Sequence, residues 1–107
     1  MSAVNHLSGL AAEDAVIRHY ALPVAARRWR GPGGEIDLIL REGAAVIFVE
    51  VKAGRRAARA PDARQIARIR ASAAAWLGDE PLGQRTVCRF DVVLVEAGRV
   101  EIIANIL

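Results

Sequence analysis

The sequence predicts an α/β protein with two helices and five strands in the order αβββαββ. Two stretches have the apolar spacing of amphipathic helices, and five shorter stretches are rich in Val, Ile, Leu and Phe. Glycine and proline fall between several of these stretches. The chain has 107 residues, of which 53% are hydrophobic and 25% charged, so we expect one core and a single domain over residues 1–107.

The first helix is expected from Ser8, which can cap it, to about Tyr20, and Pro23 follows as a stop signal. Residues 24–30 (VAARRWR) should form an edge strand, because their three arginines do not suit a central strand. The sequence GPGG at 31–34 then predicts a loop.

Two β-hairpins are expected from short apolar runs separated by turn residues. Residues 35–41 and 45–52 form the first around EGA, and their composition indicates a sheet covered on both faces. Residues 87–95 and 99–103 form the second across EAG. Asp91 interrupts the second apolar run, and we assign it to a structural pair with a nearby arginine.

The second helix lies between the two hairpins. Asp62 and Gln65 have the spacing of a capping box, in which each residue's side chain bonds the other's backbone N–H. The helix should then run to Leu77 and end before Gly78.

Basic residues are concentrated in one part of the chain, although the formal net charge is only +3. Residues 55–70 contain six arginines and a single acid. Within the second helix, Arg64 and Arg68 lie opposite the apolar stripe. This pattern is compatible with phosphate binding, and a solvated helix face would have the same appearance.

Several function classes are excluded by composition. No stretch approaches the roughly 20 apolar residues that cross a bilayer, and the N-terminus has no basic region followed by an apolar one. A single cysteine, Cys88, excludes an intrachain disulfide and a zinc site built from cysteines. We therefore expect a cytoplasmic protein that does not enter membranes, with Cys88 in its core.

Three charged residues, Asp37, Glu50 and Lys52, lie within the apolar strands of the first hairpin. Strand side chains alternate between faces, so Glu50 and Lys52 share one face. A hairpin loop of two or four residues places Asp37 on that face, and a loop of three places it on the other. Lys52 is the only lysine among 15 basic residues, which favours a role that arginine cannot fill.

Glu13 lies near the middle of the first helix's apolar arc, so its carboxylate should point inward, or lie at the boundary and reach water. Converging carboxylates repel one another unless a cation lies between them, and oxygen ligands favour Mg²⁺ or Mn²⁺. The structural alternative is an ion pair between Asp37 and Lys52 at a strand end, which needs no metal.

With Asp37, twelve intervening residues and EVK at 50–52, the sequence resembles the PD-(D/E)XK nuclease superfamily. The resemblance is closer to the UPF0102 family, which is related to archaeal Holliday junction resolvases. It extends over most of the chain as four blocks in order: GLAAEDA at 9–15, GGEIDLI at 33–39, FVEVK at 48–52 and RFDVVLV at 89–95.

The resemblance implies a restriction-endonuclease-like core with a mixed sheet flanked by the two helices. It implies that Glu13, Asp37 and Glu50 are ligands of Mg²⁺ or Mn²⁺, and that Lys52 is the catalytic lysine acting with Asp37 and Glu50. The implied reaction is hydrolysis of phosphodiester bonds in DNA, including branched or repair intermediates, and resolvase relatives suggest a homodimer. Glu35 matches a glutamate of the family and could instead pair with an arginine.

Arginines of the edge strand and of the basic region would hold the backbone phosphates. The residues expected to do so are Arg28, Arg30, Arg55, Arg56, Arg64 and Arg68. Arg28 replaces an asparagine that is usual in the family, and Arg64 replaces a lysine. These two differences affect the expected substrate specificity and leave the expected metal ligands in place. The alternative function is a catalytically silent module that binds nucleic acid through a nuclease-like fold, and RNA is an open alternative to DNA.

Overall fold

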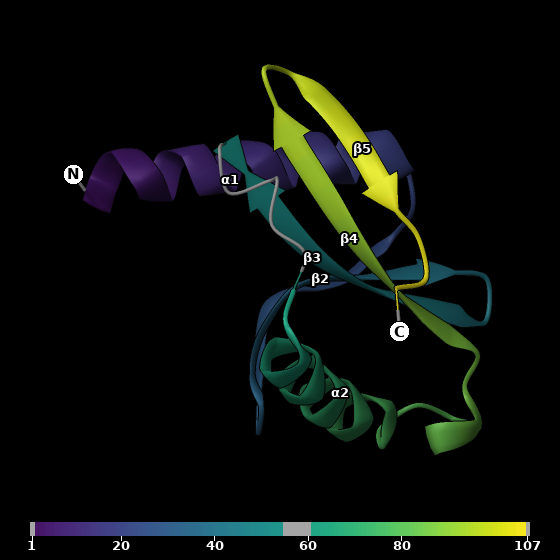
Figure 1. Ribbon diagram of the computed structural model, residues 1–107. Coiled ribbons are helices and arrows are strands. Elements are labelled where there is room, and N and C mark those ends of the chain that lie inside the picture. Colours follow the sequence, from purple (N-terminus) through teal and green to yellow (C-terminus); the bar gives the residue numbers. More distant parts are fainter. Residues whose placement is uncertain (1, 55–60, 107) are drawn as a thin grey trace.

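Five strands form one mixed sheet in the order β1-β2-β3-β4-β5, with a long helix on each side (Figure 1). The computed structural model describes residues 2–54 and 61–106, with side chains from residue 9 onward. Neighbouring strands are antiparallel except β3 and β4, which are parallel and are joined through α2. The elements are α1 (Ser2–Tyr20), β1 (Val24–Gly31), β2 (Gly34–Glu42), β3 (Ala45–Ala53), α2 (Ala63–Leu77), the 3₁₀ turn η2 (Gly83–Arg85), β4 (Cys88–Glu96) and β5 (Arg99–Ile103).

This architecture confirms the predicted α/β class, the element order αβββαββ and the edge position of β1. Two boundaries were wrong. The first helix begins at Ser2 and not at Ser8, because no glycine or proline before Ser8 interrupts it. The predicted loop at 31–34 is reduced to a two-residue turn, because Gly31 and Gly34 already pair as the ends of β1 and β2.

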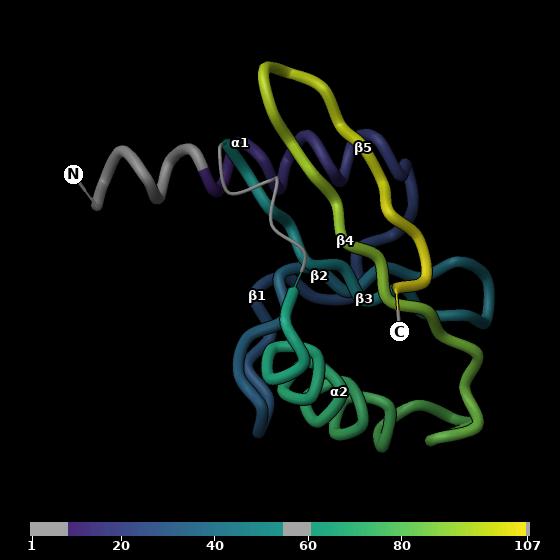
Figure 2. Tube along the Cα trace, viewed as in Figure 1, coloured from purple at the N-terminus to yellow at the C-terminus, as the bar shows by residue number. Residues whose placement is uncertain are grey.

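Each face of the sheet has its own apolar cluster, which explains why β2 and β3 are apolar on both faces. On one face Val16 of α1 packs against a set that includes Leu38 and Val49. On the other, Ala73 and Leu77 of α2 pack against a set that includes Phe48. The Cα trace shows α1 and α2 on opposite sides of β3 (Figure 2). The central strand β3 is therefore covered twice, as predicted.

The turn between β1 and β2 is fixed to α2. The Gly33 backbone N–H donates a hydrogen bond of 3.0 Å to Ser72 Oγ, and the Ser72 hydroxyl donates one of 2.8 Å to the Gly34 carbonyl. A Cβ atom on Gly33 would lie 2.0 Å from the carbonyl oxygen of Arg68. Glycine at this position thus allows the backbone of the turn to touch the backbone of the helix.

Asp91 is buried and ties three parts of the chain together. It accepts hydrogen bonds from the Tyr20 hydroxyl at 2.7 Å, from Arg89 Nε at 3.2 Å and from the Asn105 backbone N–H at 3.0 Å. Burial, followed by the bond to Asp91, raises the pKa of the Tyr20 hydroxyl far above its usual value. The predicted structural pairing of Asp91 with an arginine is confirmed.

Candidate active site

The hairpin of β2 and β3 brings Asp37 and Glu50 together. Its turn has two residues, since Glu42 pairs with Ala45, and the register continues to Leu38 opposite Val49. The next position in this register puts Asp37 opposite Glu50. Of the two predicted arrangements, the one with both carboxyl groups on one face is therefore correct.

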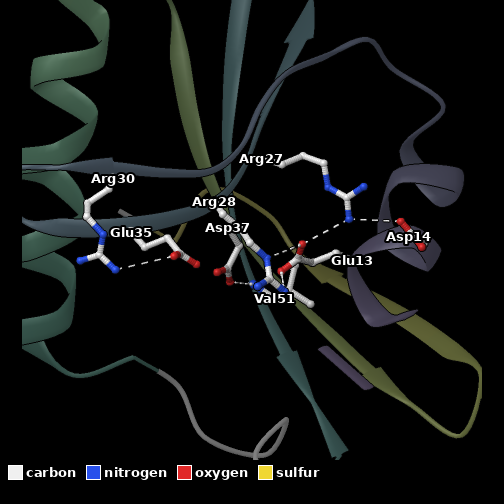
Figure 3. Close-up of polar contacts among 8 residues, drawn as sticks. All are labelled: Glu13, Asp14, Arg27, Arg28, Arg30, Glu35, Asp37 and Val51. Atoms are coloured by element: carbon white, nitrogen blue, oxygen red, sulfur yellow. Dashed lines mark hydrogen bonds and ion pairs between the residues drawn. The ribbon is translucent and has the colours of Figure 1, made fainter. Parts of the chain in front are cut away.

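Asp37 replaces part of the backbone ladder with its own side chain. The backbone pairing of β2 with β3 reaches Leu38 and Val49, and just beyond it Asp37 Oδ2 accepts a hydrogen bond of 2.8 Å from the Val51 backbone N–H (Figure 3). This bond fixes the Asp37 carboxyl between the two strands. It also leaves the other oxygen, Oδ1, for the neighbouring carboxyl group.

The electrostatics of this pair are unfavourable when both groups are charged. Burial raises the pKa of Asp37 to about 8, and the hydrogen bond and negative charge of Glu50 add to the rise. The Val51 N–H and the positive charge of Lys52 oppose it only in part. The raised pKa of Asp37 shows that the pair resists carrying two negative charges, and a cation placed between the carboxylates would relieve the same repulsion.

A small apolar pocket adjoins the pair and explains its poor solvation. The pocket has a volume of about 10 Å³, which is room for roughly one water molecule. Asp37 and Glu50 line it together with apolar side chains such as Phe48 and Ile69. Little water can therefore solvate the inner side of the carboxylates.

Gln65 is a site residue whose spacing in the sequence predicted a different role. Asp62 Oδ1 accepts a hydrogen bond of 2.8 Å from the Gln65 backbone N–H, so Asp62 caps α2 as predicted. The Gln65 side chain, however, donates to Glu50 Oε2 at 3.0 Å, and among the described residues it makes no bond back to Asp62. The contact could not be predicted from the spacing of a capping box, because that pattern pairs the Gln65 side chain with the backbone of Asp62 and not with Glu50.

Lys52 lies two residues beyond Glu50 on β3 and is half-buried. Its charge acts on Asp37, since it lowers the pKa of that carboxyl. Within the described ranges, 9–54 and 61–106, no carboxylate lies within ion-pair distance of its ammonium. The structural alternative of an ion pair between Asp37 and Lys52 is therefore not formed.

Glu13 points inward from α1, and its side chain is only 7% exposed. Two arginines of β1 neutralise it: Arg27 at 3.3 Å from Oε1, and Arg28 at 3.1 Å from Oε2. Among the residues with described side chains, no three carboxylates, histidines or cysteines are grouped to hold one metal ion. The structure thus joins Asp37 with Glu50 and places Arg28 beside Glu13, so the role of Glu13 as a ligand stays a prediction.

Arg28 occupies the space between the two groups of acids. The register of Arg27 with Leu38 and Trp29 with Ile36 puts Arg28 opposite Asp37. In Figure 3 its guanidinium lies between the carboxyl groups of Glu13 and Asp37. The hydrogen bond to Glu13 and then its charge raise the pKa of Arg28, and the charges of Glu35 and Asp37 add to the rise. Its backbone has φ of 49°, which is uncommon for a residue other than glycine.

Where the structure describes them, the arginines expected to bind phosphates lie on β1 and α2. Arg64 and Arg68 are exposed on α2, opposite its buried stripe, as predicted. Arg30 is 77% exposed and lies 3.9 Å from Glu35, a loose contact between neighbouring strands. Of the other three, Arg28 lies beside Glu13, and Arg55 and Arg56 lie outside the described residues.

These features define an α/β protein whose mixed sheet presents a pair of carboxyl groups beside a lysine. The family model described as "Uncharacterised protein family UPF0102" matches residues 12–95, and this chain belongs to that family. The prediction of UPF0102 membership is thereby confirmed.

Relatives in the family align over almost the whole chain. A UPF0102 protein of Cereibacter sphaeroides is 53% identical over 109 residues, covering 95% of this chain and 93% of the relative. One from Ruegeria pomeroyi is 53% identical, covering 94% and 88%. A UPF0102 protein of Dinoroseobacter shibae is 43% identical, covering 94% and 80%.

Neither α1 nor α2 has the length and apolar character needed for a helix to span a membrane.

Proposed function

We propose that this chain is a metal-dependent endonuclease of the PD-(D/E)XK superfamily that hydrolyses phosphodiester bonds in DNA, with branched or repair intermediates as substrates. One observation carries the proposal. Asp37 and Glu50 face each other across β2 and β3 at the edge of a poorly solvated pocket, and Lys52 follows Glu50 on the same strand. Partly buried carboxyl groups in such contact are costly unless they hold a cation or a proton.

The donor set fits Mg²⁺ or Mn²⁺. Both groups offer oxygen, which hard divalent cations prefer, and no sulfur or imidazole donor belongs to the pair. Asp37 and Glu50 would hold the ion, with Glu13 as a further ligand if it is released from its arginines. When bound, such an ion acts as a Lewis acid that polarises a phosphoryl oxygen and neutralises developing negative charge.

The chain's own residues supply the rest of the chemistry. Gln65 holds one oxygen of Glu50 and so fixes how the carboxylate faces Asp37. Lys52 places a compact positive charge beside Asp37, where it can orient the attacking water or stabilise charge on the phosphate. Arg30, Arg64 and Arg68 would bind phosphates of the backbone, which positions the strand without reading its sequence.

A second candidate is a catalytically silent module that binds nucleic acid, and a specific observation favours it. Glu13, the third expected ligand, is already neutralised by Arg27 and Arg28. A site that keeps an arginine in place of a metal could bind phosphates through its arginines without cutting them.

The test is incubation of the purified chain with flaps, forks, four-way junctions, single strands and RNA, each with Mg²⁺ or Mn²⁺. Glu50→Ala should abolish cleavage, whereas Glu101→Ala removes an exposed glutamate on β5 and should leave cleavage unchanged. Cleavage that persists undiminished in Glu50→Ala would contradict the assignment. Binding without cleavage of any substrate would favour the silent module, and a preference for one substrate would separate junctions from flaps and DNA from RNA.

A further inference from the structure

The position of Arg28 suggests how metal binding and nucleic-acid binding are connected at this site. Its guanidinium makes two contacts with Glu13, from Nε to Oε1 at 3.3 Å and from Nη2 to Oε2 at 3.1 Å. On its other side lie the carboxyl groups of Asp37 and Glu35, whose charges both act on it (Figure 3). A positive group thus already stands between two carboxyl groups that the proposed function assigns to a divalent cation.

We propose that Arg28 is a tethered cation that takes the place of a divalent ion beside Glu13 and Asp37 until a backbone phosphate draws it away. This inference rests on the proposed function and adds a rule to it: the metal binds tightly only when nucleic acid is present. Arg28 then makes tight metal binding depend on bound nucleic acid, and its role is more than a general contact to phosphate.

The geometry allows such an exchange. The Arg28 side chain is 33% exposed, so a phosphate can reach it from solvent. A guanidinium binds a phosphate through two parallel hydrogen bonds, which can replace the hydrogen bond and the ion-pair contact that it makes with Glu13. Departure of Arg28 would not leave Glu13 as an unpaired buried charge, because Arg27 remains 3.3 Å from the same carboxylate.

The backbone also sets Arg28 apart from Arg27. With φ of 49°, Arg28 is held in a conformation that glycine and asparagine adopt readily and that long side chains adopt at a cost. Strain of this kind persists where the surrounding structure enforces it, and it is concentrated at ligand clamps and active sites. Here it directs the side chain toward Glu13 and Asp37.

Coupling of this type is reciprocal. If a phosphate removes Arg28 and so strengthens metal binding, the metal must strengthen nucleic-acid binding by the same factor. An arginine that only contacted phosphate would produce no such link, and its removal would weaken nucleic-acid binding without improving the metal site.

The test is Mn²⁺ titration of the whole chain by calorimetry, which needs no catalysis. Arg28→Asn is the main variant, since asparagine tolerates the positive φ, and Arg28→Gly is a second variant that keeps the backbone if the first fails to fold. Arg27→Gln is the matched control, because it removes the other arginine bound to Glu13 without opening the space beside Asp37. Thermal unfolding of each variant without metal verifies the fold.

Arg28→Asn removes the charge that stands between Glu13 and Asp37, where the ion would bind, so Mn²⁺ should bind about tenfold tighter or more. Arg27→Gln removes a charge shared between Glu13 and Asp14, outside that place, so Mn²⁺ affinity should stay within about twofold. In a Lys52→Arg background, in which cleavage should be about 100-fold slower or more, a duplex oligonucleotide should tighten Mn²⁺ binding when Arg28 is present and not in Arg28→Asn. Equal Mn²⁺ affinity of wild type and both Arg28 variants overturns this inference alone. Absence of Mn²⁺ binding in every variant, with or without the oligonucleotide, overturns the metal-dependent function as well.

Discussion

The carboxyl group of Asp37 lies within hydrogen-bonding reach of the carboxyl group of Glu50, across the β2–β3 hairpin. Ionising two acids in such contact costs free energy, because their negative charges repel each other. The small apolar pocket beside them admits little water that could solvate these charges. The consequences for stability and activity can be measured.

Asp37 should make the metal-free protein less stable as pH rises. The pKa of Asp37 is raised in the folded state, from 3.8 to about 8, so its stabilising proton is fully present below about 3.8 and lost as pH passes 8. Asp37→Asn, which can still accept the Val51 hydrogen bond, should therefore gain stability over wild type at pH 9 in EDTA. We expect a gain of at least about 1.4 kcal/mol, the equivalent of one pKa unit.

Urea unfolding at pH 3.5, 6 and 9 measures this gain, provided that both proteins remain folded at the lowest pH. The difference between the two proteins should grow with pH and be smallest at pH 3.5, where the side chain is neutral in the folded state and mostly neutral in the unfolded state. A difference that is independent of pH would show that Asp37 titrates normally.

Lys52→Arg separates catalysis from structure. It keeps the positive charge near Asp37, so folding and nucleic-acid binding should change little. The planar guanidinium cannot occupy the position of the compact ammonium, and cleavage should fall about 100-fold or more, the scale seen when a transition-state donor is lost. Cleavage rate and filter binding are measured in parallel for both proteins. Undiminished cleavage would show that Lys52 contributes only its positive charge.

Arg64→Ala with Arg68→Ala should weaken binding to all sequences alike, because exposed arginines on α2 would bind phosphates. The slope of log affinity against log salt should drop by about 0.9 for each phosphate of duplex DNA that the protein no longer neutralises. Fluorescence anisotropy over a salt series measures both quantities. Arg99→Ala, an exposed arginine at the start of β5, is the control, and an equal loss of affinity there would indicate attraction by net charge alone.

Gln65→Ala should lower metal affinity or cleavage about 10-fold to 100-fold, the range found when a partner of a metal ligand is removed. The cap of α2 should survive, because Asp62 bonds the Gln65 backbone and not its side chain. Gln84→Ala is the matched control, since Gln84 bonds the Ala74 carbonyl near the other end of α2. Calorimetry with Mn²⁺ distinguishes the roles, and equal effects of the two changes would mark Gln65 as an ordinary surface residue.

The sequence predicted the fold closely because its signals were local. Alternating apolar residues, the Asp62 cap and Gly78 mark α2 and the strands without reference to distant parts of the chain. The sequence did not decide whether Asp37 and Glu50 lie on the same face of the sheet, because a change of one residue in the length of the hairpin loop reverses the answer.

Contacts between distant elements could not be predicted in this way. The bond from Gln65 to Glu50 and the pairing of Arg28 with Glu13 depend on how helices dock on the sheet. The same holds for Gly33, whose role depends on the path of α2, although the sequence around it showed only a loop.

The site combines a local contact within one hairpin with a contact between elements that are distant in the chain. Asp37 and Glu50 belong to a hairpin closed by a two-residue turn, and hairpins of this kind form within microseconds. Gln65 can reach Glu50 only after the chain has made the α2 crossover that sets β4 parallel to β3, a slower, non-local step. We therefore expect the two acids to meet before their glutamine partner arrives, so that acidity or a divalent cation, by easing their repulsion, should change the refolding rate as well as the stability of the folded protein.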